Sequence, residues 1–150
     1  MREALRVMVL ATLTAPAVAQ TADAPITTAV NQEEGEYLVA ATGHALYTFK
    51  ADTQGTPSSP AKSACEDECL GVWPPLIVDE PPVGDDKVRA ELLGRVVRPD
   101  GTLQATYNGW PLYFYAEDVE PTDIKGDDIE SFGEDWYLIG PMGNRPDRDD

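Results

Sequence analysis

The chain has 150 residues, with 27 acidic against 11 basic residues and a net charge of −16 at pH 7. This length is typical of one domain, and a hydrophobic fraction of 42% excludes a disordered chain. The negative charge excludes nucleic acid and anionic lipid surfaces as partners, because they would repel the protein. It leaves a basic envelope protein or a cationic ligand as a possible partner, although acidity also keeps a protein soluble without any partner.

Residues 1–19 have the pattern of a secretory signal peptide. Arg2 and Arg6 flank the start of an apolar run, which ends in the small residues Ala17-Val18-Ala19. The run is too short for a membrane span, and no cysteine follows the cleavage point to carry a lipid. We expect a mature protein that begins near Gln20, carries a net charge of −17 and has no membrane span. Its expected location is the periplasm or the cell envelope.

Residues 20–34 are small and polar without any period, and we expect a flexible leader there. The pattern of β-forming residues begins at Gly35, and residues 35–141 are the expected β domain. Two runs around Thr42-Gly43 predict a hairpin. In the second run, alternation places Tyr47 and Phe49 on the same face.

The middle of the chain reads as loop and covering segment. A stretch rich in Gly, Pro and Ser leads to Cys65 and Cys69, where one helical turn is possible. Two Pro-Pro pairs in 72–86 predict an extended segment at the edge of a sheet, because proline cannot donate to a central ladder. Residues 72–86 are called the covering segment below. The spacing of apolar residues in 87–96 favours one short helix.

Turn signals in the second half predict three consecutive antiparallel strands, joined at Asp100-Gly101 and Asn108-Gly109. A last strand is expected at 136–141, followed by a disordered acidic tail over 142–150. The predicted class is therefore all-β, with a minor helix possible. It consists of antiparallel hairpins with about six or seven strands.

One ten-residue pattern occurs twice. The stretch "GHALYTFKAD" (Gly43–Asp52) returns 66 residues later as "GWPLYFYAED" (Gly109–Asp118), with Gly, Leu, Tyr, an aromatic residue and Asp at the same offsets. This recurrence predicts an internal duplication with two equivalent units about an approximate twofold axis. The aromatic pair can be core, with the Asp fixing a turn through backbone N–H groups. Alternatively, Asp52 and Asp118 converge on one ion or polar ligand.

These motifs resemble those of secreted bacterial proteins and lipoproteins with a repeated Y-x-(F/W/Y)-x-x-D motif, a family described as a secreted repeat of unknown function. The resemblance extends from about Gly43 to Pro141, although the lipobox cysteine of many relatives is absent. The loop after the second motif is longer and more acidic than in the family, which removes support for a ligand role there. The motif residues are Tyr47, Phe49, Asp52, Trp73, Pro74 and Pro75, and in the second copy Tyr113, Tyr115 and Asp118.

Cys65 and Cys69 are expected to form a disulfide, because one helical turn brings two such residues within bonding range and exported proteins are oxidised. The alternative is a metal-handling or redox accessory protein that uses these two thiols. Against it, no His lies beside them, and acidic neighbours disfavour a thiolate.

Other candidate sites have weaker signals. The acidic loop after the second motif could bind calcium, although EF-hand spacing is absent. His44 is expected as a turn residue, and three tryptophans either pack in the core or line a groove for a sugar or peptide. The weak metal candidates are Asp52, Asp118, Asp123, Asp127 and Asp128, and the tryptophans are Trp73, Trp110 and Trp136. The sequence indicates no catalytic constellation and no cofactor, so we predict a binding or interaction module rather than an enzyme.

Overall fold

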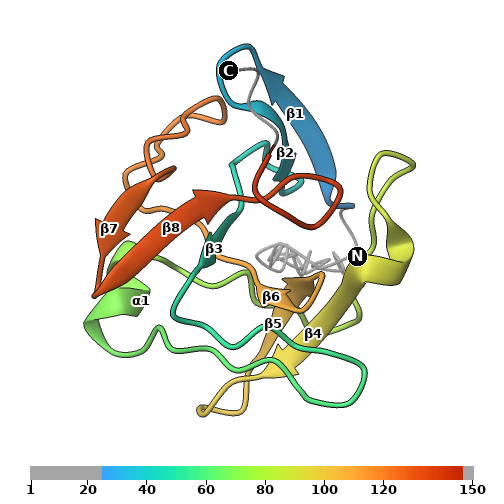
Figure 1. Cartoon of the computed structure of the whole chain (residues 1–150), viewed down its shortest axis with the longest axis vertical. Helices are drawn as coiled ribbons and strands as arrows, with labels where there is room; N and C mark the ends of the chain where they lie inside the picture. The colour runs from blue at the N-terminus through green and yellow to red at the C-terminus, as the bar shows by residue number, and fades with distance from the viewer. Residues whose placement is uncertain (1–24, 147–150) are drawn as a thin grey trace, which may run out of the picture.

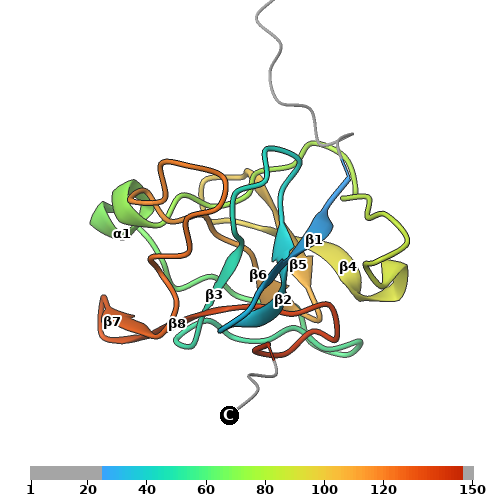
Figure 2. The same ribbon diagram turned by 90° about the horizontal axis from the view of Figure 1, so that it is seen from above.

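The structure is a computed structural model that describes residues 25–146. The predicted signal peptide and the first residues of the predicted leader lie outside the described residues. The described part is mostly β, with eight strands in three antiparallel sheets, which confirms the predicted class (Figures 1 and 2). The elements are β1 (Thr27–Asn31), β2 (Gly35–Val39), β3 (Tyr47–Phe49), α1 (Glu68–Val72), η1 (Ala90–Leu92), β4 (Leu93–Val97), β5 (Leu103–Tyr107), β6 (Trp110–Pro111), β7 (Ile129–Ser131) and β8 (Glu134–Leu138).

The first three strands and the next three are built alike. β1 pairs with β2 and β4 pairs with β5, each over five residues of each strand. The chain then turns back through Gly43 in the first unit and Gly109 in the second, both with positive φ. Leu46 N–H donates to the Leu38 carbonyl in one unit, and Leu112 N–H donates to the Ala105 carbonyl in the other. This correspondence confirms the predicted duplication.

The two units exchange strands. β3 of the first unit pairs with β8 of the second, with Tyr47 opposite Leu138. Tyr113, just after β6, pairs with Pro75 in the covering segment of the first unit. At the centre Tyr47 and Tyr113 pair with each other, and each N–H donates to the other's carbonyl, at 2.8 and 3.0 Å. The central position of β3 among the sheets is visible in Figure 1.

The interior holds two hydrophobic clusters on opposite faces of this central crossing. Tyr47 and Phe49 belong to one cluster and Leu46 to the other, as the alternation in the sequence predicts. The first cluster contains most of the large aromatic rings and the two cysteines. The second cluster is largely aliphatic and lies under β4, β5 and the covering segment.

The ends of the described chain are more ordered than the sequence predicts. The expected leader over 20–34 contains β1, because its β-branched Thr and Val residues pair with β2 along its whole length. In the expected disordered tail, residues 142–146 fold back. Asn108 donates to the Gly143 carbonyl at 3.0 Å, and the Arg145 guanidinium lies 4.2 Å from the centroid of the Tyr137 ring. Residues 147–150 lie outside the described part.

The middle elements are shorter than predicted. The helix expected within 87–96 is the single 3₁₀ turn η1, after which the chain enters β4. The last of the three strands predicted around Asp100-Gly101 and Asn108-Gly109 is only the dipeptide β6, because Pro111 has no N–H group to extend the ladder. A helical turn at the cysteines is present as α1, which lies at the opposite side of the molecule from η1 in Figures 1 and 2.

Candidate functional site

The motif aromatics and two tryptophans form a stack of four rings at the centre of the molecule. Phe49 stacks on Trp136 at 4.1 Å between centroids, Trp136 on Trp73 at 3.9 Å, and Trp73 on Tyr115 at 4.2 Å. The stack runs symmetrically from the motif of one repeat to that of the other. Both indole N–H groups donate to Ser131, one to its hydroxyl and one to its carbonyl. These rings are core, so Trp73 and Trp136 line no groove.

Each motif tyrosine donates a hydrogen bond to the motif aspartate of the other repeat. Tyr47 Oη lies 2.5 Å from Asp118 Oδ2, and Tyr113 Oη lies 2.8 Å from Asp52 Oδ2. The second oxygen of each carboxylate accepts a backbone N–H group, from Ala64 for Asp52 and from Lys125 for Asp118. The carboxylates therefore lie in separate places on the two sides of the stack and do not converge on a shared ligand.

Asp52 belongs to a buried polar network that includes a guanidinium group. Tyr113 Oη also bonds the hydroxyl of Ser63, which accepts a hydrogen bond from Arg98 at 2.9 Å. Arg98 donates further to the Gln104 side chain and to the Cys65 carbonyl. Burial raises the pKa of Asp52 to about 6, although the hydrogen bonds and the positive charge of Arg98 lower it.

Asp118 has no such guanidinium. No Lys or Arg side chain in the described part of the chain forms an ion pair with it, and the Lys125 ammonium lies 3.9 Å from Asp123 instead. Burial raises the pKa of Asp118, although the hydrogen bonds from Tyr47 and the Lys125 N–H group lower it. The negative charge of Asp123 raises this pKa and the positive charge of His44 lowers it. Asp118 is 7% exposed, so it is a nearly buried acid.

A cavity of about 310 Å³ opens beside Asp118. Its walls are mostly apolar and come from both repeats: Thr42, His44, Ala45, Pro74, Phe114, Tyr115, Ala116 and Asp118. One His44 ring nitrogen lies 2.9 Å from the Thr42 hydroxyl, and the other lies 3.2 Å from the Val119 carbonyl. Because a carbonyl only accepts, Nε2 carries the proton. His44 thus ties the first repeat to the loop that follows the second motif.

The remaining predicted metal candidates do not gather around one point. Asp123 accepts the N–H groups of Val119 and Glu120, which fixes a turn. Asp127 accepts Leu138 N–H, and Arg145 lies 3.9 Å from Asp127 and 3.5 Å from Asp128. Among the described residues no group of three acidic, His or Cys side chains could hold a metal ion.

Cys65 and Cys69 are joined by a disulfide, with 5.3 Å between their Cα atoms. Both residues lie in the aromatic cluster and are almost fully buried, at 0% and 4% exposed. Cys65 precedes α1 and Cys69 lies within it, and the turn that leads into the helix, in which Cys69 N–H donates to the Glu66 carbonyl, supplies the spacing. The disulfide anchors the loop that carries Ser63 and Ala64, so its role in this structure is to position the Asp52 network.

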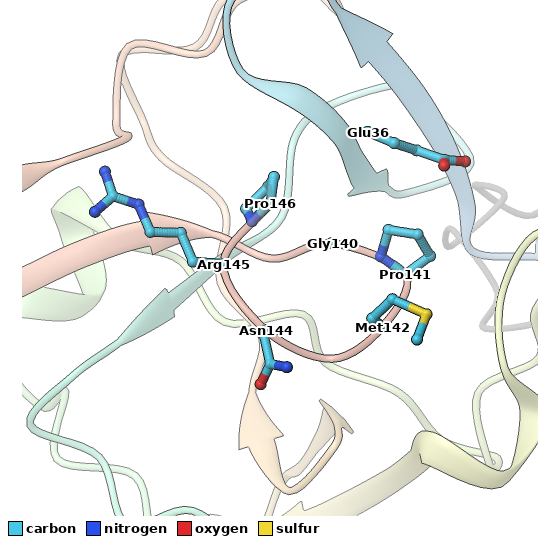
Figure 3. A pocket seen from close by; sticks show the side chains of 7 residues that line it. All are labelled: Glu36, Gly140, Pro141, Met142, Asn144, Arg145 and Pro146. Atoms are coloured by element: carbon cyan, nitrogen blue, oxygen red, sulfur yellow. The ribbon is translucent and has the colours of Figure 1, made fainter. Parts of the chain in front are cut away.

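A second cavity, of about 260 Å³, lies under the C-terminal loop. It is lined by Glu36, Gly140, Pro141, Met142, Asn144, Arg145 and Pro146. Glu36 and Arg145 extend in opposite directions, and prolines and Met142 form most of the remaining wall (Figure 3). Because its polar groups do not converge, this cavity is a weaker candidate than the one at Asp118.

Several site residues were missed by reasoning from the sequence. Arg98 is a buried cation that bonds Gln104 in its own repeat and Ser63 and Cys65 in the other, and Ser63 lies in a loop rich in Gly, Pro and Ser. Phe114 packs against the second hydrophobic cluster, whereas Tyr113 belongs to the first. The one available signal is Phe114 itself, a large aromatic residue where the first repeat has Thr48.

These observations define a class, namely an interlocked β domain made of two repeats that complete each other's interior. The chain belongs to the family described as a secreted repeat of unknown function, whose model matches twice, at residues 28–77 and 94–139. These two segments are the two units that exchange strands. No curated protein and no solved structure matches the chain. None of the helices in residues 25–146 is both long and apolar enough to cross a membrane.

Proposed function

We propose that this exported protein is a binding module of the periplasm or cell envelope and that its partner is basic. One observation carries the proposal. The chain has 27 acidic against 11 basic residues, and the buried carboxylates of the described part are those of Asp52, Asp118 and Asp127, whose side chain is 5% exposed. The other described acids face solvent at least in part, so the protein has a strongly negative surface. Such a surface raises the local concentration of cations and speeds the approach of a basic partner.

The alternative, a metal-handling or redox role for Cys65 and Cys69, has less support. Both sulfurs are committed to one disulfide inside the aromatic cluster. A metal-binding or attacking thiolate would first require reduction of this bond and exposure of the loop around it.

Calorimetric titration of the protein with tetralysine tests the proposal, and fully acetylated tetralysine is the matched neutral control. We expect saturable binding of tetralysine alone. Its affinity should fall as sodium chloride rises from about 0.01 M to about 0.1 M, because the Debye length falls from about 30 Å to about 10 Å. Absence of saturable binding at low salt, or equal binding of both peptides, would reject a basic partner.

A further inference from the structure

We propose that the cavity beside Asp118 is the site that receives one ammonium or guanidinium group of the basic partner. The inference rests on the proposed function and adds a place and a ligand chemistry to it. A general acidic surface attracts cations everywhere. The cavity differs from that surface because it combines a nearly buried carboxylate with two aromatic side chains, those of Phe114 and Tyr115.

The duplication supplies an internal comparison for this inference. The carboxylate of Asp52, which is equivalent to Asp118, is connected through Tyr113 and Ser63 to the guanidinium of Arg98. At Asp118 the described residues provide no guanidinium, and a cavity is present instead. Asp118 accepts hydrogen bonds from Tyr47 and from the Lys125 N–H group, and the positive charge of a protonated His44 favours its ionised form. It has no permanently charged partner, and burying a carboxylate without one is costly. A cationic group from a partner can therefore supply at Asp118 the positive charge that Arg98 supplies near Asp52.

The walls of the cavity suit a cation better than an anion or a neutral apolar group. Tyr115 and Phe114 can offer π electrons, which attract ammonium and guanidinium groups. Glu117 lies just before Asp118, and the loop that follows Asp118 contains the carboxylates of Glu120 and Asp123. Lys125 is the one cation in residues 119–128, and it lies near Asp123. Tyr115 Oη donates to Glu117, which keeps that acid at the rim.

The first repeat differs at the equivalent wall positions. Thr48 stands where the second repeat has Phe114, and Lys50 stands where it has Ala116. Ala116 is exposed and lines the cavity, and its N–H donates to the Val72 carbonyl, an interaction that any side chain except proline permits. The first repeat thus lacks one aromatic wall and carries its own cation there. These two positions can be exchanged between repeats to test the site.

The test compares Ala116→Lys with Ala90→Lys in the tetralysine titration of the full chain. Both variants add one positive charge to an exposed alanine, but Ala90 lies in η1 and does not line the cavity. We expect Ala116→Lys to weaken binding by about tenfold or more, and Ala90→Lys by less than about twofold. Phe114→Thr leaves the charge unchanged and removes one aromatic wall, and it should weaken binding by about two- to fivefold.

The outcomes separate the two proposals. Equal loss in Ala116→Lys and Ala90→Lys, with no effect of Phe114→Thr, would show that only surface charge matters and would overturn the cavity site while the proposed function stands. Absence of tetralysine binding to the unaltered protein would overturn both. A thermal unfolding curve of each variant identifies any that fails to fold. In the unaltered protein, tetralysine should shift the NMR signals of the His44 and Tyr115 rings, whereas unchanged ring signals with saturable binding would also overturn the cavity site.

Discussion

Asp52 and Asp118 occupy the same position in the two repeats and accept the same hydrogen bond from the tyrosine of the opposite repeat. Their surroundings differ. The Asp52 side is closed by a disulfide loop and a buried Arg98, whereas the Asp118 side has an acidic loop and an open cavity. The shared motif therefore builds the interior of both repeats, while the segment after each motif determines which groups lie near the carboxylate.

The interlocking of the repeats predicts that neither folds alone. Fragments covering 25–86 and 87–146 would each lack the partner strand of their own motif, since β3 pairs with β8 and Tyr113 pairs with Pro75. We expect each fragment to show no cooperative unfolding transition by circular dichroism. An equimolar mixture should recover one. A cooperative transition in either isolated fragment would mean that the exchange is not essential.

The ring stack at the boundary predicts the largest effect of a single substitution. Trp73→Ala and Trp136→Ala should each lower the free energy of unfolding by about 3–5 kcal/mol, as is usual for fully buried large aromatic residues. Because the two rings stack directly on each other, the double variant should lose less free energy of unfolding than the sum of the two single losses. The half-buried Trp110 is the control, and Trp110→Ala should cost clearly less. Urea unfolding measures the free energy of unfolding of the four variants and of the unaltered protein, and strict additivity would contradict a shared stack.

The raised pKa of Asp52 predicts how stability depends on pH. The folded state binds this proton more tightly than the unfolded state, where the pKa of Asp is about 3.9. Protonation of Asp52 therefore contributes on the order of 3 kcal/mol to the free energy of unfolding. This contribution is fully present below about pH 4 and is lost as the pH rises through about 6.

Asp52→Asn should remove this part of the pH dependence. Urea unfolding between pH 4 and pH 7 should give a flatter profile for the variant than for the unaltered protein. Asp118→Asn should change the profile in the same direction, because burial raises that pKa as well. An unchanged slope in Asp52→Asn would show that the carboxylate titrates as it does in water.

Removal of the disulfide is expected to have the smallest effect. Cys65 and Cys69 close a very short loop, so the chain-entropy contribution to the free energy of unfolding is about 2 kcal/mol. The double variant Cys65→Ala, Cys69→Ala should lose about this amount. NMR shift changes should concentrate near Ser63 and Arg98, with little change in the His44 and Tyr115 signals. Equal changes at both carboxylates would contradict the separate roles of the two sides.

The sequence predicted features that depend on local pattern. Alternation placed Tyr47 and Phe49 on one face, and the Asp-Gly and Asn-Gly turns located the second set of strands. The recurrence of ten residues revealed the duplication. The alternation and the turn signals are each contained within a few neighbouring residues, where steric and hydrogen-bonding preferences act directly. The recurrence is visible because the same short pattern is written twice.

The sequence could not reveal features that depend on distant pairing. The exchange between β3 and β8 has no local signature, because either strand pairs equally well with any neighbour of suitable pattern. The polar segment of β1 looked like a leader, since its strand character comes from β2. The difference between Asp52 and Asp118 depends on Arg98, which is distant from Asp52 in the sequence.

The pairing of β3 with β8 has a further consequence for folding after export. Tyr47 and Leu138 are opposite each other although about 90 residues separate them, and contacts of this kind form late and slowly. A chain that crosses a membrane unfolded and amino end first delivers β3 well before β8. β3 therefore remains unpaired with β8 until most of the chain has crossed the membrane. The order in which segments arrive therefore makes complete translocation a condition for closing the interior.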